Sequence, residues 1–309
     1  NTGDHMTEPD LYDFIEQHKL PASYIDLARH WFIPVADEIA ERQKYLTETI
    51  ILGINGTQGS GKSTLADLLN YLFAEQYGMD VVVLSIDDFY YTRQRREELA
   101  KNIHPLLLTR GVPGTHDVDL ALDVINGLID GNSTMRLPRF DKSTDDRVPE
   151  QYWEVVSDQP DIIIFEGWCL GAEPQPDVEL EQAINELESS EDKDGSWRRY
   201  VNRVLHDDYL ELFSTVDIWI MLKAPSFDCV HEWRMEQEDK LRNRLEQQNA
   251  DTSGTMDSKQ IARFIQHYQR ITEYLLKTLP PRVDYLFELD TDRNIINSSR
   301  PKGGWDTLA

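Results

Sequence analysis

Only two of the 309 residues are cysteine, Cys169 and Cys229, and they lack the CxxC spacing of a redox or zinc motif. Two cysteines cannot form a disulfide framework, so we expect two buried, free thiols and a cytoplasmic location. Long hydrophobic runs are also missing, since Val81–Ile86 and Ile162–Phe165 are far shorter than the roughly 20 residues that cross a bilayer. These absences exclude a disulfide-rich secreted domain and predict no membrane partner.

Basic residues are scarce as well. Lys and Arg total 31 against 56 Asp and Glu, which gives a formal charge of −25. A chain this negative repels a phosphate backbone, so we expect no nucleic-acid partner. Any anionic small-molecule substrate must then be bound by a local group of Lys, Arg and helix dipoles, together with a divalent cation. Hydrophobic residues make up 40% of the chain, which is enough for one large or two modest folded domains.

The first 48 residues predict helices. Residues 1–5, before Met6, are expected to be a cloning remnant, and the polar, acidic N-terminus lacks the apolar stretch of a signal peptide. From Leu11 to Leu46, apolar residues recur three and four positions apart, and Pro21 separates two helical segments. We therefore predict an N-terminal helical extension over residues 6–48.

The hydrophobic period then changes. Thr49–Ile54 predicts a buried strand, and four further apolar runs do the same: Val81–Ile86, Asp161–Phe165, Val216–Leu222 and Tyr285–Leu289. Helical segments separate them: Lys62–Tyr77, Asp117–Ile129, Ser226–Gln248 and Asp257–Leu279. Strands that are buried on both faces and separated by helices predict an α/β fold with a mostly parallel sheet between two helical layers.

Capping residues and composition define the remaining segments. Asp117 and Ser226 are predicted helix N-caps, and Asp257 with Gln260 has capping-box spacing. Residues 173–195 are acidic and punctuated by proline, which predicts a surface insertion with a short helix inside it. We predict one catalytic domain over 49–297, with a helical lid at about 226–257 and a C-terminal tail at 298–309.

One motif identifies a nucleotide site. Gly56–Ser63 reads GTQGSGKS, which matches GxxxxGK[ST] between a predicted strand and a predicted helix. Glycines let backbone N–H groups surround the phosphates, and the helix N-terminus adds a positive dipole. Lys62 can reach the β- and γ-phosphate oxygens, while the Ser63 hydroxyl can bind Mg²⁺. The predicted nucleotide contacts are Gly56, Thr57, Gln58, Gly59, Ser60, Gly61, Lys62, Ser63 and Thr64.

Two acidic positions follow buried strands. Asp87 and Asp88 end the strand Val81–Ile86, and a carboxylate there can accept the proton of an attacking hydroxyl or help to hold Mg²⁺. Glu166 follows Ile162–Phe165 in a Walker-B-like position, where it would hold the metal, and Gly167 permits close backbone approach. The chain lacks the NKxD motif of GTPases and the second module of larger ATPases, which favours small-molecule kinases.

Five segments resemble the plant-type D-glycerate 3-kinase family, a group of P-loop kinases related to phosphoribulokinase, uridine kinase and pantothenate kinase. They are Ser85–Tyr90 (SIDDFY), Arg110–Asp117 (RGVPGTHD), Phe140–Ser143 (FDKS), Phe165–Gly171 (FEGWCLG) and Glu232–Arg234 (EWR). The resemblance extends over about residues 50–297. It implies a three-layer P-loop fold with a helical lid, and ATP- and Mg²⁺-dependent phosphorylation of a small hydroxyl substrate.

The resemblance also implies roles for individual residues. Asp87 would be the general base, and Asp88 would cap the following turn. Lys62 and the lid residue Arg234 would stabilise the transferring phosphoryl group, and Ser63 with Glu166 would hold the metal. Asn294 lies in the stretch that flanks adenine. The implied substrate-binding residues are Asp87, Tyr90, Arg110, His116, Asp117 and Lys142. Where nucleoside kinases tend to carry a second lid arginine, this chain has Gln237, and Arg242 or Arg244 can compensate.

The substrate stays open at this point. D-glycerate, converted to 3-phosphoglycerate, is the first choice. A related kinase for another small alcohol, sugar or nucleoside is the alternative, and a non-catalytic nucleotide-binding regulatory protein is the third. Joint retention of Lys62, Ser63, Asp87 and Glu166 argues against the last alternative, because a protein without turnover does not need all four. The sequence leaves the oligomeric state undetermined.

Overall fold

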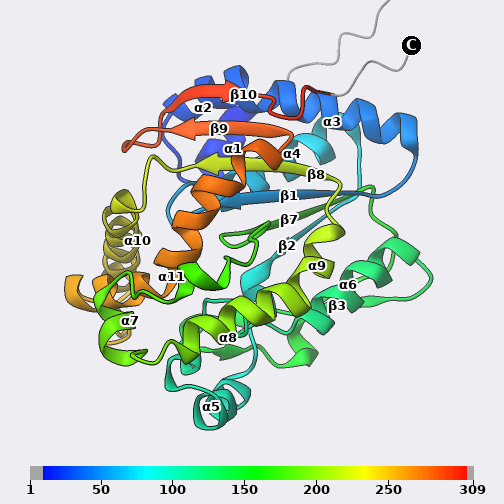
Figure 1. Ribbon diagram of the computed structural model, residues 1–309. Coiled ribbons are helices and arrows are strands. Elements are labelled where there is room, and N and C mark those ends of the chain that lie inside the picture. The colour runs from blue at the N-terminus through cyan, green and yellow to red at the C-terminus, as the bar shows by residue number, and fades with distance from the viewer. Residues whose placement is uncertain (1–9, 305–309) are drawn as a thin grey trace, which may run out of the picture.

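The computed structural model describes residues 10–304, which form three layers around one central sheet (Figure 1). The predicted cloning remnant lies outside these residues, as does the end of the predicted tail. Within the described residues the main sheet has six strands in the order β10-β9-β8-β1-β7-β2. Their bounds are β1 (Ile50–Gly56), β2 (Val81–Ser85), β7 (Ile162–Gly167), β8 (Ile218–Lys223), β9 (Tyr285–Leu289) and β10 (Ile295–Ser299).

All five predicted strands are present and pair in parallel, which confirms the predicted fold class. The sequence analysis missed β10, which pairs antiparallel with β9 at the sheet edge. Three of its five residues, Asn297–Ser299, are polar, and most of the strand is exposed. It therefore has no continuous apolar run by which the sequence could reveal it. Two short hairpins, β3 (Met135–Leu137) with β6 (Glu154–Val156) and β4 (Phe140–Asp141) with β5 (Asp146–Arg147), lie outside the main sheet.

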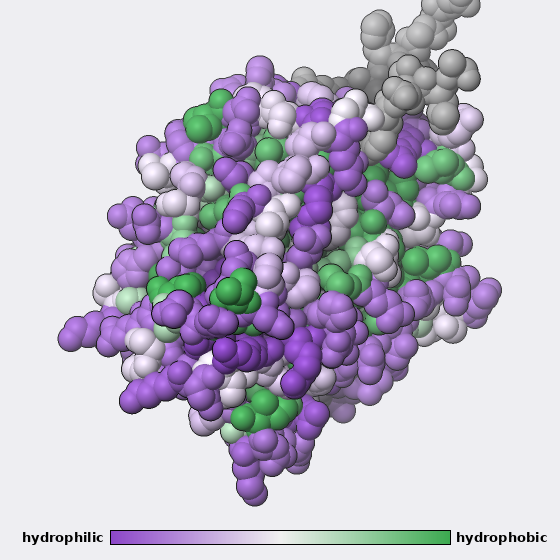
Figure 2. Space-filling view, viewed as in Figure 1, coloured by the Kyte–Doolittle hydropathy of each residue, from purple (hydrophilic) through white to green (hydrophobic). Residues whose placement is uncertain are grey.

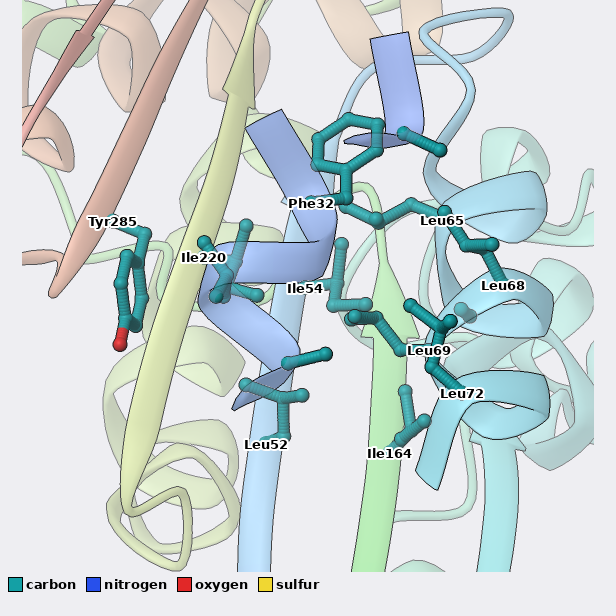
Figure 3. Packing of buried hydrophobic residues seen from close by; sticks show 14 of the residues in the cluster. Phe32, Leu52, Ile54, Leu65, Leu68, Leu69, Leu72, Ile164, Ile220 and Tyr285 are labelled. Carbon is teal, nitrogen blue, oxygen red and sulfur yellow. The ribbon is translucent and has the colours of Figure 1, made fainter. Parts of the chain in front are cut away.

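Alternate residues of the strands pack into two hydrophobic layers. Leu52, Ile54 and Ile164 face α4 (Lys62–Tyr77) and the N-terminal helices α1 (Leu11–Gln17), α2 (Ser23–Leu27) and α3 (Ile33–Leu46) (Figure 3). On the opposite face, Ile163 and Phe165 belong to a second core with α6 (Val118–Asp130), α9 (Leu210–Ser214) and α11 (Ser258–Thr278). Because both faces of the sheet are covered, the strands read as continuous apolar runs.

The N-terminal segment has the predicted break near Pro21 and one unpredicted feature. A π-helical turn, Ala28–Phe32, joins α2 to α3. Pro34 follows it, and proline has no N–H with which to continue the ordinary i→i−4 ladder. Phe32 packs edge-on against Phe287 of β9, with ring centroids 5.3 Å apart. These helices therefore share one core with the sheet.

Two of the three predicted N-cap residues cap a helix in the structure. Asp117 accepts from the N–H of Leu120 at the start of α6, and Asp257 and Gln260 form the predicted capping box of α11. The long helix α10 (Asp228–Gln247) begins two residues after the predicted cap. Phe227 is its N-cap, and Ser226 Oγ accepts from the N–H of Asp228 at 3.3 Å.

The prediction that residues 173–195 form a surface insertion was wrong in one respect. The segment contains a short helix, α7 (Glu186–Glu191), but Glu188 is fully buried and binds Arg270 of α11 through both carboxylate oxygens, at 2.9 and 2.7 Å. Arg270 also donates to the carbonyls of Glu179 and Gln182. The acidic composition therefore reflects, in part, a carboxylate that pairs with a buried arginine rather than with solvent.

The molecular surface is mainly polar. Figure 2 shows hydrophobic residues in small, separate groups on the face it presents.

Two further α-helices of the described residues are α5 (Arg93–Asn102) and α8 (Ser196–Val204). Over residues 10–304 no helix has both the length and the apolar character required to cross a membrane.

Candidate active site

The loop between β1 and α4 has the geometry of a phosphate-binding loop. Gly59 and Gly61 adopt left-handed conformations, with φ of 76° and 95°. A Cβ at Gly59 would lie 2.6 Å from the Cβ of Trp233, so a larger residue would displace α10 from the loop. The α4 helix starts at Lys62, which directs its free N–H groups and dipole toward the loop.

Arg293 holds this loop from the other side, and the sequence analysis did not single it out. Its guanidinium donates to the carbonyl oxygen of Gly59, lies 5.0 Å from the Trp233 ring centroid and pairs with Glu236 at 2.7 Å. It follows β9 in the stretch that was expected to flank adenine, with a left-handed φ of 66°. The bond to Gly59 joins residues 234 positions apart, so no local sequence pattern predicts it.

The two predicted metal ligands lie together. Ser63 Oγ is 3.5 Å from Glu166 Oε1, and the other Glu166 oxygen is buried without a hydrogen-bond partner among the described residues. Burial raises the pKa of Glu166, against the opposing field of Lys62. Gly167 is closely packed, because a Cβ there would lie 2.6 Å from Ile86 Cγ2.

This pair suits a Mg²⁺ ion. A half-satisfied buried carboxylate and a hydroxyl are hard oxygen donors, which Mg²⁺ prefers. Residues 10–304 hold no cluster of three or more His, Cys, Asp or Glu side chains arranged for a metal. A cation here would therefore depend on phosphate oxygens and water for most of its ligands, as Mg²⁺ commonly does in nucleotide sites.

Asp87 lies in a 3₁₀ turn (Ile86–Phe89) directly after β2. Its Oδ2 accepts from Lys142 Nζ at 2.7 Å, and the Tyr90 hydroxyl also hydrogen-bonds to this carboxylate. Burial opposes ionisation of Asp87, but Lys142 and Lys62 outweigh it and hold its pKa well below the usual range. The carboxylate is therefore ionised at neutral pH and able to accept a proton.

Asp88 was expected to cap the following turn, and this was wrong. Its Oδ1 accepts from the N–H of Phe140 at 3.3 Å, so it attaches the Phe140–Ser143 segment to the end of β2. The 3₁₀ turn is capped instead by Ser85, whose Oγ accepts from the N–H of Asp87 at 3.2 Å. Burial raises the pKa of Asp88 to about 6. The two adjacent carboxylates thus differ in their partners and in the direction of their pKa shifts.

His116 lies beneath the Tyr90 ring. The two rings are stacked with centroids 4.6 Å apart, and His116 Nδ1 is 2.6 Å from the Tyr209 hydroxyl. The side chain is 2% exposed, and burial lowers its pKa to about 4, so the imidazole is neutral at physiological pH. Its Nε2 has no hydrogen-bond partner among the described residues. Asp117, the next residue, caps α6 and lies 3.8 Å from Arg147.

The cations on this side are accompanied by carboxylates. Arg110 pairs with Asp145 at 2.7 Å, and the fully buried Arg96 binds the same carboxylate at 3.1 Å. Both guanidinium groups lie 5.7 Å from the Phe140 ring centroid. We use the term acceptor side for Asp87, Tyr90, Arg110, His116, Asp117 and Lys142. The fold brings these residues together from three separate segments of the chain.

Helix α10, in the predicted lid, lies beyond the end of the sheet toward which β8 and β9 point (Figure 1). Arg234 pairs with Glu238 at 3.3 Å and lies 5.8 Å from the Phe264 ring centroid. Of the two arginines considered as a second lid cation, Arg242 donates to Thr255 and Met256 in the α10–α11 connection, and Arg244 is exposed.

A cavity of about 660 Å³ begins at the phosphate loop, where Gly59, Gly61 and Thr64 line it. Asn294, the predicted adenine neighbour, also lines the cavity, and its Nδ2 donates to Asp290 Oδ2 at 3.1 Å. A second, small cavity lies between residues 173–205 and α11, away from the phosphate loop. Of the two, the larger has both the size and the position for a nucleotide.

Comparisons with known proteins agree with this geometry. The model of the phosphoribulokinase/uridine kinase family matches residues 51–173, which include the phosphate loop, Asp87 and Glu166. A Schizosaccharomyces pombe protein described as the uncharacterized kinase mug58 is 34% identical over 79% of this chain and 88% of its own length. The chloroplastic D-glycerate 3-kinase of Arabidopsis thaliana is 28% identical over 86% of this chain, which spans 60% of the plant protein.

A solved structure supports the fold. The D-glycerate 3-kinase from Cryptococcus neoformans superimposes with a TM-score of 0.68, covering 86% of this chain and 96% of that one. Sequence identity in this superposition is 24%. The superposition therefore shows that the two chains share a fold.

Proposed function

We propose that this chain, which belongs to the phosphoribulokinase/uridine kinase family, is a D-glycerate 3-kinase. The chain is a P-loop kinase of the glycerate 3-kinase type, an ATP-dependent phosphotransferase with an alcohol group as acceptor. The proposal adds the acceptor itself. It depends on one observation: the general-base candidate Asp87 is ion-paired with Lys142, a half-exposed cation that a small anionic alcohol can recruit.

Glycerate carries one carboxylate and two hydroxyl groups. When it binds, its carboxylate takes the Lys142 ammonium away from Asp87, with Arg110 as a second cation within the acceptor side. Asp87 then accepts a hydrogen bond from the C3 hydroxyl. The exchange replaces one ion pair by another, so the charge of Lys142 stays neutralised throughout.

Asp87 accepts the hydroxyl proton as the oxygen–phosphorus bond forms and the bond from the γ-phosphorus to the bridging oxygen of ADP breaks. The low pKa of Asp87 suits this role, because phosphoryl transfer through a loose transition state needs an oriented hydroxyl more than a strong base. Lys62, together with Arg234 from the lid, stabilises the negative charge on the transferring group. Tyr90 and His116 hold the acceptor side in place through their stacked rings.

Mg²⁺ is the cation for which Ser63 and Glu166 are suited. When bound, it supplies charge neutralisation at the phosphate oxygens. Ser63 would hold it directly, and Glu166 would hold it directly or through water. The buried, unpartnered Oε2 of Glu166 supports this assignment, since a buried carboxylate oxygen without a partner costs free energy that a cation recovers.

A coupled ADP-release assay over D-glycerate, L-glycerate, pantothenate, ribulose 5-phosphate and nucleosides tests the proposal. We expect turnover with D-glycerate, and phosphorus NMR of the product should show 3-phosphoglycerate rather than 2-phosphoglycerate. Lys142→Ala should raise KM for D-glycerate by tenfold or more with a small change in KM for ATP. Lys101→Ala, an exposed lysine on α5, is the matched control. Turnover of another alcohol in preference to D-glycerate would reject the substrate assignment.

A further inference from the structure

The large cavity extends well beyond the phosphate loop. Its volume of about 660 Å³ exceeds what three phosphates fill, and three other segments line the rest of it. These are Leu20–Phe32 from the N-terminal helices, Gln237 and Lys240 of α10, and Asp292–Ile295 before and within β10. With its phosphates at Gly59–Ser63, a nucleoside triphosphate would place its nucleoside among these segments.

The lining has the chemistry of a purine-binding slot. Half-buried apolar side chains of Leu20, Leu27 and Trp31 form one side of the cavity, which we call the N-terminal wall. Leu289 of β9 and Ile295 of β10 also line it. A purine has two apolar faces and a polar edge, so it suits a slot with apolar sides and a few polar groups. Ser23 and Asp26 of α2 supply polar atoms along the same cavity.

The N-terminal wall is fixed in position by the fold. Trp31 packs edge-on against Phe287 of β9 with centroids 6.3 Å apart, and Phe32 packs against the same ring. The Tyr71 hydroxyl of α4 donates to the carbonyl of Asp10 at 2.7 Å, which attaches the start of α1 to the phosphate-loop helix. Because α4 and β9 both contact the nucleotide site, the wall is held in register with it.

We propose that the N-terminal helices form one wall of the nucleoside subsite, with Leu27 and Trp31 against the base of ATP. This inference rests on the proposed function for its occupant, ATP, and is independent of the acceptor. It gives the N-terminal segment a binding role in addition to its packing role. The subsite is then completed by residues that precede the phosphate-loop motif by some 30 positions.

Calorimetry with two probes tests the proposal: ADP with Mg²⁺, which occupies both parts of the cavity, and inorganic tripolyphosphate, which reaches the phosphate loop alone. Leu27→Ala removes part of the wall, and Ser23→Trp fills the slot from an exposed position on α2. We expect each variant to bind ADP about tenfold more weakly or worse, with tripolyphosphate affinity within twofold of wild type. Tyr45→Ala, on an exposed part of α3, is the matched control and should change neither.

Steady-state kinetics gives a second readout. Both wall variants should raise KM for ATP while KM for D-glycerate changes less than twofold, and thermal melting monitors folding. Unchanged ADP affinity in both variants would overturn the proposal, and so would equal losses for ADP and tripolyphosphate, which would indicate a distorted phosphate loop. If the wild type fails to bind ADP at all, the proposed function itself is wrong, which is a separate and recognisable result.

Discussion

The two ends of the phosphoryl-transfer path are built in different ways. On the phosphate side, one continuous segment, Gly56–Ser63, presents backbone N–H groups and a helix dipole that need no rearrangement when an anion arrives. On the acceptor side, charged side chains come from several segments and are paired with one another, as in Asp87 with Lys142 and Arg110 with Asp145. The phosphate side is preorganised for any triphosphate, whereas in the proposed reaction the acceptor side exchanges partners.

This difference has an energetic consequence. A backbone site gains affinity directly from the ligand's charge, because its dipoles are already oriented. A paired side-chain site gains only the difference between the new ion pair and the old one, which is small for exposed pairs. Selection among acceptors on this side should therefore depend on geometry and charge together.

The largest effect should come from Lys62, on the phosphate side. Lys62→Ala should lower kcat by about 10³–10⁵-fold, the range for a cation that stabilises a transferring phosphoryl group. The melting temperature should stay near that of wild type, since this side chain is a partly exposed ligand and not part of the core. Lys101→Ala is the control. Full activity in Lys62→Ala would remove the kinase mechanism altogether.

On the acceptor side, the adjacent acids should behave differently. Asp87→Asn keeps the shape but loses proton acceptance, so kcat should fall by roughly 10²–10⁴-fold. Asp88→Asn retains an oxygen for the Phe140 N–H and removes a carboxylate whose pKa is already raised to about 6, so activity should change little. Steady-state kinetics on both variants decides between them. If Asp88→Asn is the slower of the two variants, the general base is Asp88 and not Asp87.

Removal of Mg²⁺ should have a smaller effect, seen in the affinity for ADP. ADP should bind about tenfold more weakly, or worse, in EDTA than in Mg²⁺, because the −25 chain must otherwise hold the diphosphate with Lys62 and the helix dipole alone. Glu166→Gln should reduce this difference. Equal ADP affinity in both conditions by calorimetry would remove Ser63 and Glu166 from their metal roles.

Acid should lower stability through His116 on the acceptor side. His116 has its pKa lowered to about 4 by burial, below the 6.5 of an unfolded chain, so the unfolded state binds its proton first as pH falls. The contribution of His116 to the free energy of unfolding should therefore decrease as the pH falls from 6.5 to 4, by up to about 1.4 kcal/mol per pH unit. His116→Gln should flatten this part of the urea-unfolding profile without changing ADP affinity. His267→Gln is the comparison, because His267 is also buried and its pKa is also lowered, but it lies away from the acceptor side.

Sequence reasoning was most successful where one segment carries the information. The phosphate loop, α4 from Lys62 to Tyr77 and all five parallel strands were predicted, because glycine spacing and continuous apolar runs depend on local sequence. It was weaker where distant residues meet. Arg293 on the Gly59 carbonyl, Asp88 on Phe140 and Glu188 on Arg270 are contacts between segments 50 or more positions apart. No periodicity or motif encodes such pairs, so the structure was needed to find them.

The buried Glu188–Arg270 pair fastens α11 to residues 173–195. Arg270 ties α11 to residues 173–195 through two carboxylate bonds and two carbonyls, and breaking a buried pair of this kind typically costs about 3–5 kcal/mol. The lid helix α10 has no comparable anchor to that segment among the contacts of residues 10–304. Glu238 and Arg242 of α10 instead hold Met256 in the connection to α11. A displacement of α10 would therefore pull on the start of α11, which the Glu188–Arg270 pair keeps in place.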